Sequence, residues 1–391
     1  MPRKNCNQME SKLEPIAACL DSSIVSCVVS ILGGHFSISM NRRRFLISST
    51  GALLVAPLAG YSNSYTSRIR IGQIGTQHAH ASGKMKAIRD QPEAYELIGV
   101  VESDPNERAK RLNSAAYEGV NWMTEEELFN VPGLEAVAIE TLVKELVPTA
   151  LRCIRAGLHI HLDKPGGDSL PEFRELLNEA EKRKRVVQMG YMLRYNPAFQ
   201  FMYQAVRDGW LGDIMEIDCM MGKMASSSVR EELGRFTGGG MFELGGHVID
   251  SIVYMLGKPI SVTPFSKATQ ADGVLDNQLA VLDYKDSTAT VRINHRDPYG
   301  GPRRRFQISG DKGAIEIQQL ESGDFTLYLD EARESFKKGA QEVNLGKEGR
   351  YDGEFRDLAR VIRKKKAFDW SYQHDLDTHE ALLMASGMPT A

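Results

Sequence analysis

"RIRIGQIGTQHAH", residues 68–80, joins a short β-rich run to a glycine turn at Gly75. This order is typical of the first strand and phosphate turn of a dinucleotide-binding domain, where the pattern G-x-G-x-x-G is expected. Counted from Gly75, that pattern requires glycines at positions 77 and 80, and the chain has Gln77 and His80 there. The first glycine permits the tight turn, but a side chain at position 77 must either displace the phosphates or reach them itself.

The altered turn keeps groups that can bind an anion. Thr76, Gln77 and His78 are hydrogen-bonding residues, and the helix N-terminus beyond them offers unpaired N–H groups and positive potential. The glycine pattern alone therefore leaves cofactor binding open.

Strands and helices alternate after this turn, which predicts a parallel, doubly wound sheet. Glu102 ends the second predicted strand, 27 residues beyond Gly75. A carboxylate there can accept hydrogen bonds from a ribose diol and disfavours a 2′-phosphate, which favours NAD over NADP. The expected strands are 69–75, 95–103, 134–141, 158–165 and 185–191, and the expected helices are 83–92, 147–157 and 170–184.

Hairpin-like strands predominate in the second half of the chain, and they predict an open, mainly antiparallel sheet with a helix at 241–256 packed against it. The expected strands are 212–222, 260–269, 277–284, 287–294, 304–310 and 313–319, followed by helices at 352–366 and 379–388. The fold class is α/β, with the expected organisation of a leader at 1–67, a Rossmann-like domain at 68–191, an α+β substrate and oligomerisation domain at 192–345, and docking helices at 346–391.

The N-terminal region has the features of a twin-arginine export signal: Arg42 and Arg43 precede the apolar run 47–58. This run is too short to span a bilayer, so no permanent membrane anchor is expected. Met40 stands directly before the signal and is a candidate for the true start. The expected partner is the twin-arginine export machinery and the expected location is the periplasm or beyond; the alternative is a basic tail on a cytoplasmic enzyme.

Composition narrows the possible partners and metal sites. The 391 residues carry a formal net charge of −3, which gives no reason to expect a nucleic acid partner. Only Cys153 and Cys219 follow the leader, and they are not spaced as a metal site. Glu243 and His247 have a spacing that also occurs in metal sites, but no third ligand is evident, so no metal is expected.

Three blocks, "LHIHLDKP" (158–165), "GYMLRYNP" (190–197) and "GGGMFELGGHVID" (238–250), resemble in order and spacing those of the glucose–fructose oxidoreductase/inositol dehydrogenase (Gfo/Idh/MocA) family. The resemblance runs from about Arg68 to the C-terminus. The chain departs from the family pattern in several places: Gln77 and His80 replace glycines, Leu142 and Leu146 follow the fourth strand, Asp163 stands in the E-K-P block, and Glu243 replaces an aspartate.

The resemblance implies a Rossmann domain, an open-sheet domain that commonly pairs subunits, and an active site between them. It implies NAD or NADP as cofactor, carbohydrate substrates (sugars, polyols or glycosides), Lys164 beside the nicotinamide and the reacting hydroxyl, and His247 as acid or base. The candidate cofactor-binding residues are Gly75, Thr76, Gln77, His78, Glu102, Thr141, Asp163 and Lys164.

The residues around His247 suggest how the site could work. Glu243 lies four positions before His247 and Asp250 three positions after it, so one helix face carries all three. A carboxylate beside a histidine raises its basicity, which makes Glu243 a candidate catalytic residue. Arg194, Tyr195 and Asp250 are candidate substrate contacts, although a hinge at Asn196–Pro197 explains the same block.

These features predict an exported oxidoreductase that transfers hydride to or from a carbohydrate. Because free nicotinamide nucleotides are scarce outside the cytoplasm, a tightly bound cofactor and redox-balanced chemistry are expected. One form of that chemistry oxidises one sugar and reduces another; the other is a glycosidase or lyase that oxidises its substrate transiently. The alternatives are a sugar-binding protein with a degenerate nucleotide site and a cytoplasmic NAD-linked dehydrogenase.

Overall fold

The computed structural model describes residues 67–391. The predictions for the export leader, including Arg42 and Arg43, lie outside the described residues. Within 67–391 we find no helix with the length and apolar character needed to cross a membrane.

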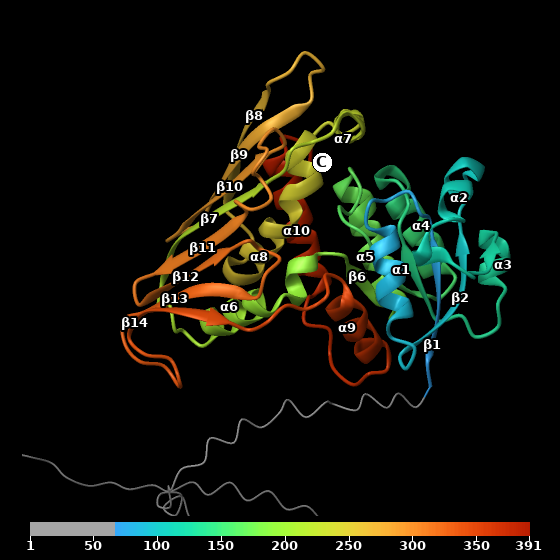
Figure 1. The fold of residues 1–391 in the computed structure, drawn as a ribbon, viewed down its shortest axis with the longest axis horizontal. Helices are drawn as coiled ribbons and strands as arrows, with labels where there is room; N and C mark the ends of the chain where they lie inside the picture. The colour runs from blue at the N-terminus through green and yellow to red at the C-terminus, as the bar shows by residue number, and fades with distance from the viewer. Residues whose placement is uncertain (1–66) are drawn as a thin grey trace, which may run out of the picture. The chain divides into compact units, whose positions relative to one another are not determined.

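The first domain is built on a parallel sheet with strand order β3-β2-β1-β4-β5-β6 (Figure 1). This is the order of a dinucleotide-binding fold, in which the ligand crevice lies at the carboxyl ends of the strands. The strands are β1 (Ile69–Ile74), β2 (Tyr95–Val101), β3 (Trp122–Met123), β4 (Ala136–Ile139), β5 (His159–Leu162) and β6 (Val187–Met189). The helices are α1 (Ala81–Arg89), α2 (Pro105–Arg111), η1 (Ala115–Tyr117), α3 (Glu125–Phe129), α4 (Val143–Arg155) and α5 (Leu170–Arg183).

The central strands of the first sheet are mostly buried, as their apolar sequences predicted. All four residues of β4 are buried, as expected for a strand covered on both faces by helices. Helices α4 and α5 pack together on one side, and their apolar faces join the main core. The predicted parallel, doubly wound sheet is confirmed.

The second domain holds a sheet with strand order β14-β13-β12-β11-β7-β10-β9-β8. Its neighbours pair antiparallel except for β7 and β10, which are parallel. The strands are β7 (Ile214–Gly222), β8 (Ser261–Ala268), β9 (Leu275–Asp283), β10 (Thr288–Asn294), β11 (Arg305–Gly310), β12 (Gly313–Gln318), β13 (Asp324–Leu329) and β14 (Gly339–Asn344). This confirms the predicted open, mainly antiparallel sheet, to which the structure adds β13 and β14.

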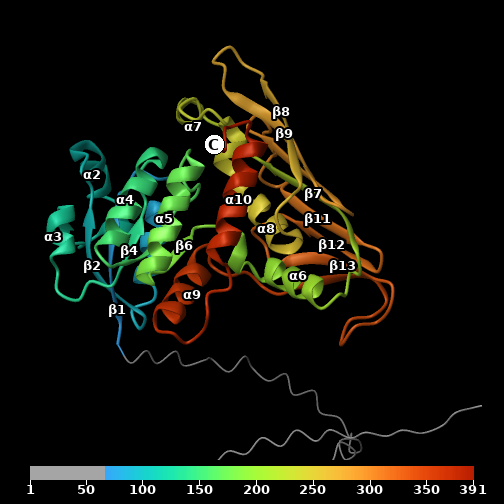
Figure 2. The same ribbon diagram turned by 180° about the vertical axis from the view of Figure 1, so that it is seen from behind.

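Helices cover the face of this sheet that is turned toward the first domain (Figures 1 and 2). They are η2 (Met192–Tyr195), α6 (Pro197–Arg207), α7 (Ser227–Leu233), η3 (Met241–Gly245), α8 (Gly246–Leu256) and α10 (Tyr372–Ala385), whereas α9 (Asp352–Ile362) packs on β1 and α1 of the first domain. The helix predicted over 241–256 is divided: η3 is a short π-helix, and α8 continues from it. This division changes the relative positions of Glu243 and His247.

Candidate active site

The candidate active site lies where the carboxyl ends of β1, β4 and β5 meet η3 and α8 from the second domain. Lys164, just after β5, donates a hydrogen bond from Nζ to the backbone oxygen of Glu243 at 2.8 Å. His247 follows Glu243 by one helical turn, so residues predicted from distant blocks come together here. A cavity of about 70 Å³ is lined by His80, Lys164 and Glu243, and it adjoins a second cavity of about 430 Å³. His78 lines both cavities.

A separate groove of about 720 Å³ runs along the carboxyl ends of β1, β2 and β4 and is lined by Gly75, Gln77, Glu102 and Thr141. Gly75 has φ +86°, and a Cβ there would lie 2.6 Å from the backbone nitrogen of Thr141. Only glycine fits this turn, which leaves the backbone open to a ligand. The Gln77 side chain lies along the groove wall, where Nε2 donates to Glu102 at 3.3 Å. The residues present therefore fit a dinucleotide.

Glu102 is buried and organises the turn between β1 and α1. Its Oε2 accepts hydrogen bonds from the Thr76 backbone at 2.8 Å and from the Thr76 hydroxyl at 2.7 Å, and its Oε1 accepts one from the backbone of Asp104 at 3.0 Å. The carboxylate thus stands at the end of β2, as predicted, with its oxygens committed to the loop. A ribose diol would have to exchange with these donors.

Lys164 and His247 are both buried, which controls their protonation. Burial lowers the pKa of Lys164, against the opposing effect of the Glu243 and Asp163 carboxylates. Burial also holds the pKa of His247 well below its usual value, and the positive charge of Lys164 adds to this effect. Neither ring nitrogen of His247 has a hydrogen-bond partner among the residues that the structure describes. His247 is therefore a buried, neutral imidazole whose nitrogens are not committed to another described residue.

Glu243 does not pair with His247, contrary to the expectation of a carboxylate–histidine pair on one helix face. Its carboxylate contacts Lys223 Nζ and His295 Nε2, each at 3.1 Å. The π-helical turn at η3 offsets the two side chains from ordinary i, i+4 spacing. Although burial opposes it, the contacts with His295, Lys164 and Lys223 hold the pKa of Glu243 well below its usual range. Glu243 therefore carries a negative charge beside the two lysines.

The candidate substrate residues Arg194, Tyr195 and Asp250 form buried internal contacts instead. Arg194 donates from Nε and Nη2 to Asp250 at 3.0 and 2.7 Å and also bonds Asp375. The Tyr195 hydroxyl donates to Asp357 at 3.0 Å. A guanidinium without solvent must be paired, and this pairing consumes the groups expected to face the substrate. The structure corrects the interpretation of Arg194 and Tyr195 as substrate contacts. Their side chains instead join η2 to helices α8, α9 and α10.

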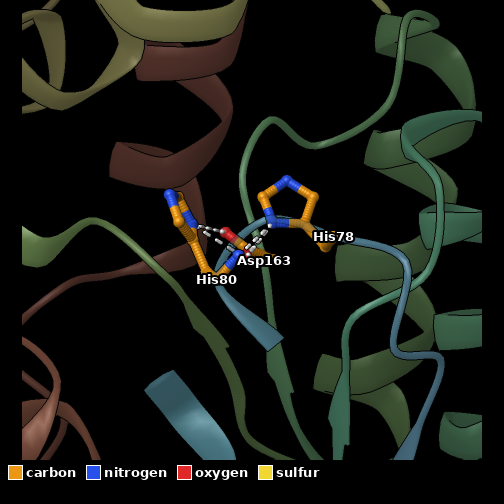
Figure 3. A group of neighbouring side chains, drawn as sticks. All are labelled: His78, His80 and Asp163. Carbon is orange, nitrogen blue, oxygen red and sulfur yellow. Dashed lines mark hydrogen bonds and ion pairs between the residues drawn. The ribbon is translucent and has the colours of Figure 1, made fainter. Parts of the chain in front are cut away.

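The residues predicted to bind the cofactor lie in two separate groups in the structure. Gly75, Gln77, Glu102 and Thr141 line the groove, with Thr76 bonded beneath it. Asp163 is instead fully buried between His78 and His80, and Figure 3 shows its carboxylate between the two imidazole rings. Lys223 and His295, which contact Glu243, were not predicted from the sequence. The signal that could have indicated them is their position directly after β7 and β10.

Two family models match the chain. Residues 69–191 match the oxidoreductase family with an NAD-binding Rossmann fold, and residues 199–316 match the Gfo/Idh/MocA C-terminal domain.

Among curated relatives, the rhizopine catabolism protein MocA of Rhizobium meliloti is 27% identical over 63% of this chain and 76% of its own length. The myo-inositol 2-dehydrogenase of Thermotoga maritima is 24% identical over 63% of this chain and 73% of its own length. The scyllo-inositol 2-dehydrogenase (NADP⁺) IolW of Bacillus subtilis is 26% identical over 47% of this chain, and the match spans about half (52%) of its length.

Solved structures share the fold. An oxidoreductase from Thermotoga maritima superposes with a TM-score of 0.69 at 19% identity, covering 82% of this chain and 96% of its own. A levoglucosan dehydrogenase, solved with NADH and levoglucosan, superposes with a TM-score of 0.70 at 17% identity over the same shares.

Proposed function

Since the chain belongs to the Gfo/Idh/MocA family of oxidoreductases, with an NAD-binding Rossmann domain, we propose that it transfers hydride between a tightly held nicotinamide cofactor and an alcohol carbon of a sugar, polyol or glycoside. Relatives that act on inositols support this substrate class. The observation that carries the proposal is that Lys164 of the first domain bonds the Glu243 backbone of the second domain, one helical turn before His247, and its charge acts on the buried His247 imidazole.

The two residues divide the proton chemistry of alcohol oxidation. The bound nicotinamide supplies the hydride acceptor. Lys164, near the reacting oxygen, stabilises the negative charge that develops there. His247, neutral because burial lowers its pKa, accepts the hydroxyl proton. Hydride and proton thus leave the alcohol, which becomes a carbonyl, and the reverse reaction returns both.

The backbone oxygen of Glu243 holds Lys164 in place, and the nearby Glu243 carboxylate favours its charged form against the effect of burial. Lys223 and His295 share the carboxylate, while Lys164 bonds the backbone oxygen of the same residue. We assign Glu243 to positioning rather than to proton transfer.

Glu102 supports NAD as the preferred cofactor. Its carboxylate stands at the end of β2, where a 2′-phosphate would meet like charge. The leader pattern supports an exported enzyme that carries its cofactor through repeated turnovers, which requires redox-balanced chemistry of either form described above.

The direct test is to denature the purified full chain and quantify the released nicotinamide nucleotides by chromatography. We expect close to one nucleotide per chain, mainly NAD(H), and a change in nicotinamide absorbance when a panel of sugars and polyols is added before denaturation. A chain that releases no nucleotide and binds no added NAD⁺ or NADP⁺ is a sugar-binding protein, and the proposal fails.

A further inference from the structure

Two departures from the family's sequence pattern meet at one point in the structure. His80 stands where the third glycine is expected, and Asp163 replaces the glutamate of the E-K-P block. They are 83 positions apart, yet His80 Nδ1 lies 3.0 Å from Asp163 Oδ2. His78 Nδ1 approaches the same oxygen at 2.7 Å (Figure 3). The altered residues therefore form a cluster of two histidines and one carboxylate.

The donor atoms of this cluster have the separations of metal ligands. One ligand atom from each of the three residues lies within 4.8 Å of the other two. Ligands at about 2.1 Å from a metal lie roughly 3.0 Å apart at right angles and roughly 3.4 Å apart in a tetrahedron. The 3.0 Å separation of His80 Nδ1 from Asp163 Oδ2 matches the right-angle case, and the 2.7 Å separation of His78 Nδ1 from the same oxygen is shorter.

The two oxygens of Asp163 have different surroundings. Oδ1 accepts the backbone N–H of Lys164 at 2.7 Å and lies 3.5 Å from the ammonium of Lys84. Oδ2 is approached most closely by the two imidazoles. The buried lysine thus leaves one carboxylate oxygen, directed at the histidines, for a further cation.

Three buried carboxylates near the cluster share one buried ammonium group, that of Lys84. Lys84 lies within 3.7 Å of three buried carboxylates, those of Glu140, Asp163 and Glu354. The oxygens of Glu140 and Glu354 have no hydrogen-bond partner among the described residues, and Glu140 Oε2 lies 4.0 Å from His78 Nδ1. Buried carboxylates need protons or cations, and the neighbouring imidazoles select a cation that nitrogen can bind.

We propose that His78, His80 and Asp163 bind a divalent transition-metal ion of the Zn²⁺, Fe²⁺ or Mn²⁺ class in the floor of the cleft. Two nitrogens and one carboxylate favour these ions over Ca²⁺ and Mg²⁺, which prefer oxygen. His78 and His80 both line the cavity shared with Lys164, so the remaining coordination positions face the substrate space. The ring centre of His247 lies 6.4 Å from that of His80.

A metal ion in this site would give the chain a cation that binds a carbohydrate oxygen close to the nicotinamide. An ion here would bind a hydroxyl or carbonyl oxygen of the substrate, a role that rests on the proposed function. Metal binding itself does not depend on that function. Without an ion, the same contacts are only hydrogen bonds between the two imidazoles and Asp163.

The test is Co²⁺ binding to the chelator-treated full chain, followed by visible absorption and by metal analysis after dialysis. The variants His78→Gln and His80→Gln each remove one ligand, and His159→Gln is the control because His159 lies at the start of β5 outside the cluster. The leader's Cys6, Cys19 and Cys27 contribute equally to all samples. We expect the wild-type chain to bind one more Co²⁺ than either ligand variant, or to bind it at least about tenfold more tightly, and His159→Gln to match the wild type.

Nicotinamide release from the same samples separates this proposal from the proposed function. Co²⁺ binding that depends on His78 and His80 supports the metal site even if no nucleotide is found. Equal Co²⁺ uptake by the wild type and both ligand variants overturns the metal site, even if nucleotide is released from every sample. An equal loss in His159→Gln also overturns it.

Discussion

His247 is the residue whose replacement tests the proposed chemistry most directly. We expect His247→Gln to lower kcat by about 10²–10⁴-fold, the usual contribution of a general base, while the bound nucleotide is retained. Steady-state kinetics and nucleotide release on the same preparation provide the measurement.

His379 offers a matched control for this variant. It is also fully buried with both ring nitrogens unpartnered among the described residues, but it packs against Phe173, whereas His247 lies near His80 and Lys164. We expect His379→Gln to keep kcat close to the wild-type value. Equal losses in the two variants would mean that buried histidines matter here only for folding.

His379 also makes stability depend on pH. Burial lowers its pKa to about 3, whereas an exposed histidine in the unfolded chain titrates near 6.5. Between these values the unfolded state binds a proton that the folded state refuses, so the free energy of unfolding falls as the pH falls, by up to about 1.4 kcal/mol per unit. His379→Leu should reduce the slope of urea-unfolding stability between pH 6.5 and 4 by up to about 1.4 kcal/mol per unit, while His80, His159 and His161 keep their contributions. A wild-type slope unchanged by this substitution would contradict the assignment.

Individual residues differ in how far the sequence could predict them. Gly75 was predicted from the tight turn after the first strand, whereas Lys164 was predicted from the resemblance of the block 158–165 to the family pattern. The contact of His80 with Asp163 was not found, since it joins loops from two strands and depends on their packing. The pairing of Arg194 with Asp375 was missed for the same reason: sequence near Arg194 does not show that a carboxylate arrives from α10.

Among the elements, α9 attaches the C-terminal region to the first domain. Phe355, Leu358, Ala359 and Ile362 lie on one apolar face, as the sequence predicted, and pack in a core with residues of β1 and α1. We expect Phe355→Ala to lower the free energy of unfolding by about 3–5 kcal/mol, because Phe355 is fully buried.

The control for Phe355 is Phe265 on β8, which is 53% exposed. Phe265→Ala should change stability by only about 0.5 kcal/mol. Denaturant unfolding of both variants checks this difference. Similar losses at the two positions would show that α9 is not anchored by this face.

Elements with strong patterns were easier to predict than weak ones. The strand at 95–103 was predicted from its continuous apolar run, and the hairpin at 310–313 was predicted from its turn residues. Strand β14 (GAQEVN) was missed because it carries few apolar residues and lies at the sheet edge, whereas β13 (DFTLYL) was missed although its apolar residues alternate as in a strand. The π-helical turn in η3 also escaped prediction, since its sequence fits an ordinary helix and tertiary contacts decide the extra residue per turn.

At the scale of the whole molecule, a buried ion network joins helices that are distant in the sequence. Arg194 in η2 bonds Asp250 of α8 and Asp375 of α10, and its guanidinium lies 5.0 Å from the ring centres of Tyr191 and Trp370. Arg194→Met leaves two buried carboxylates without their partner, so we expect a loss of about 3–5 kcal/mol in unfolding free energy. Arg207→Met, on the exposed end of α6, should be nearly neutral in the same thermal and urea unfolding measurements, and an equal cost at both positions would argue against the network.

The predicted export leader relates the binding of the cofactor to the compartment in which the protein works. If the twin-arginine pattern is read by the export machinery, the chain folds and binds its nucleotide before it leaves the cytoplasm. Replacing Arg42 and Arg43 with lysine should then keep the chain in the cytoplasm, whereas the wild-type chain is recovered from the periplasmic fraction with nucleotide bound. Fractionation followed by nucleotide analysis measures both properties at once. A wild-type chain found only in the cytoplasm would favour the alternative of a cytoplasmic NAD-linked dehydrogenase. Such an enzyme can exchange its cofactor with the cellular pool, so it has no need to retain the nucleotide.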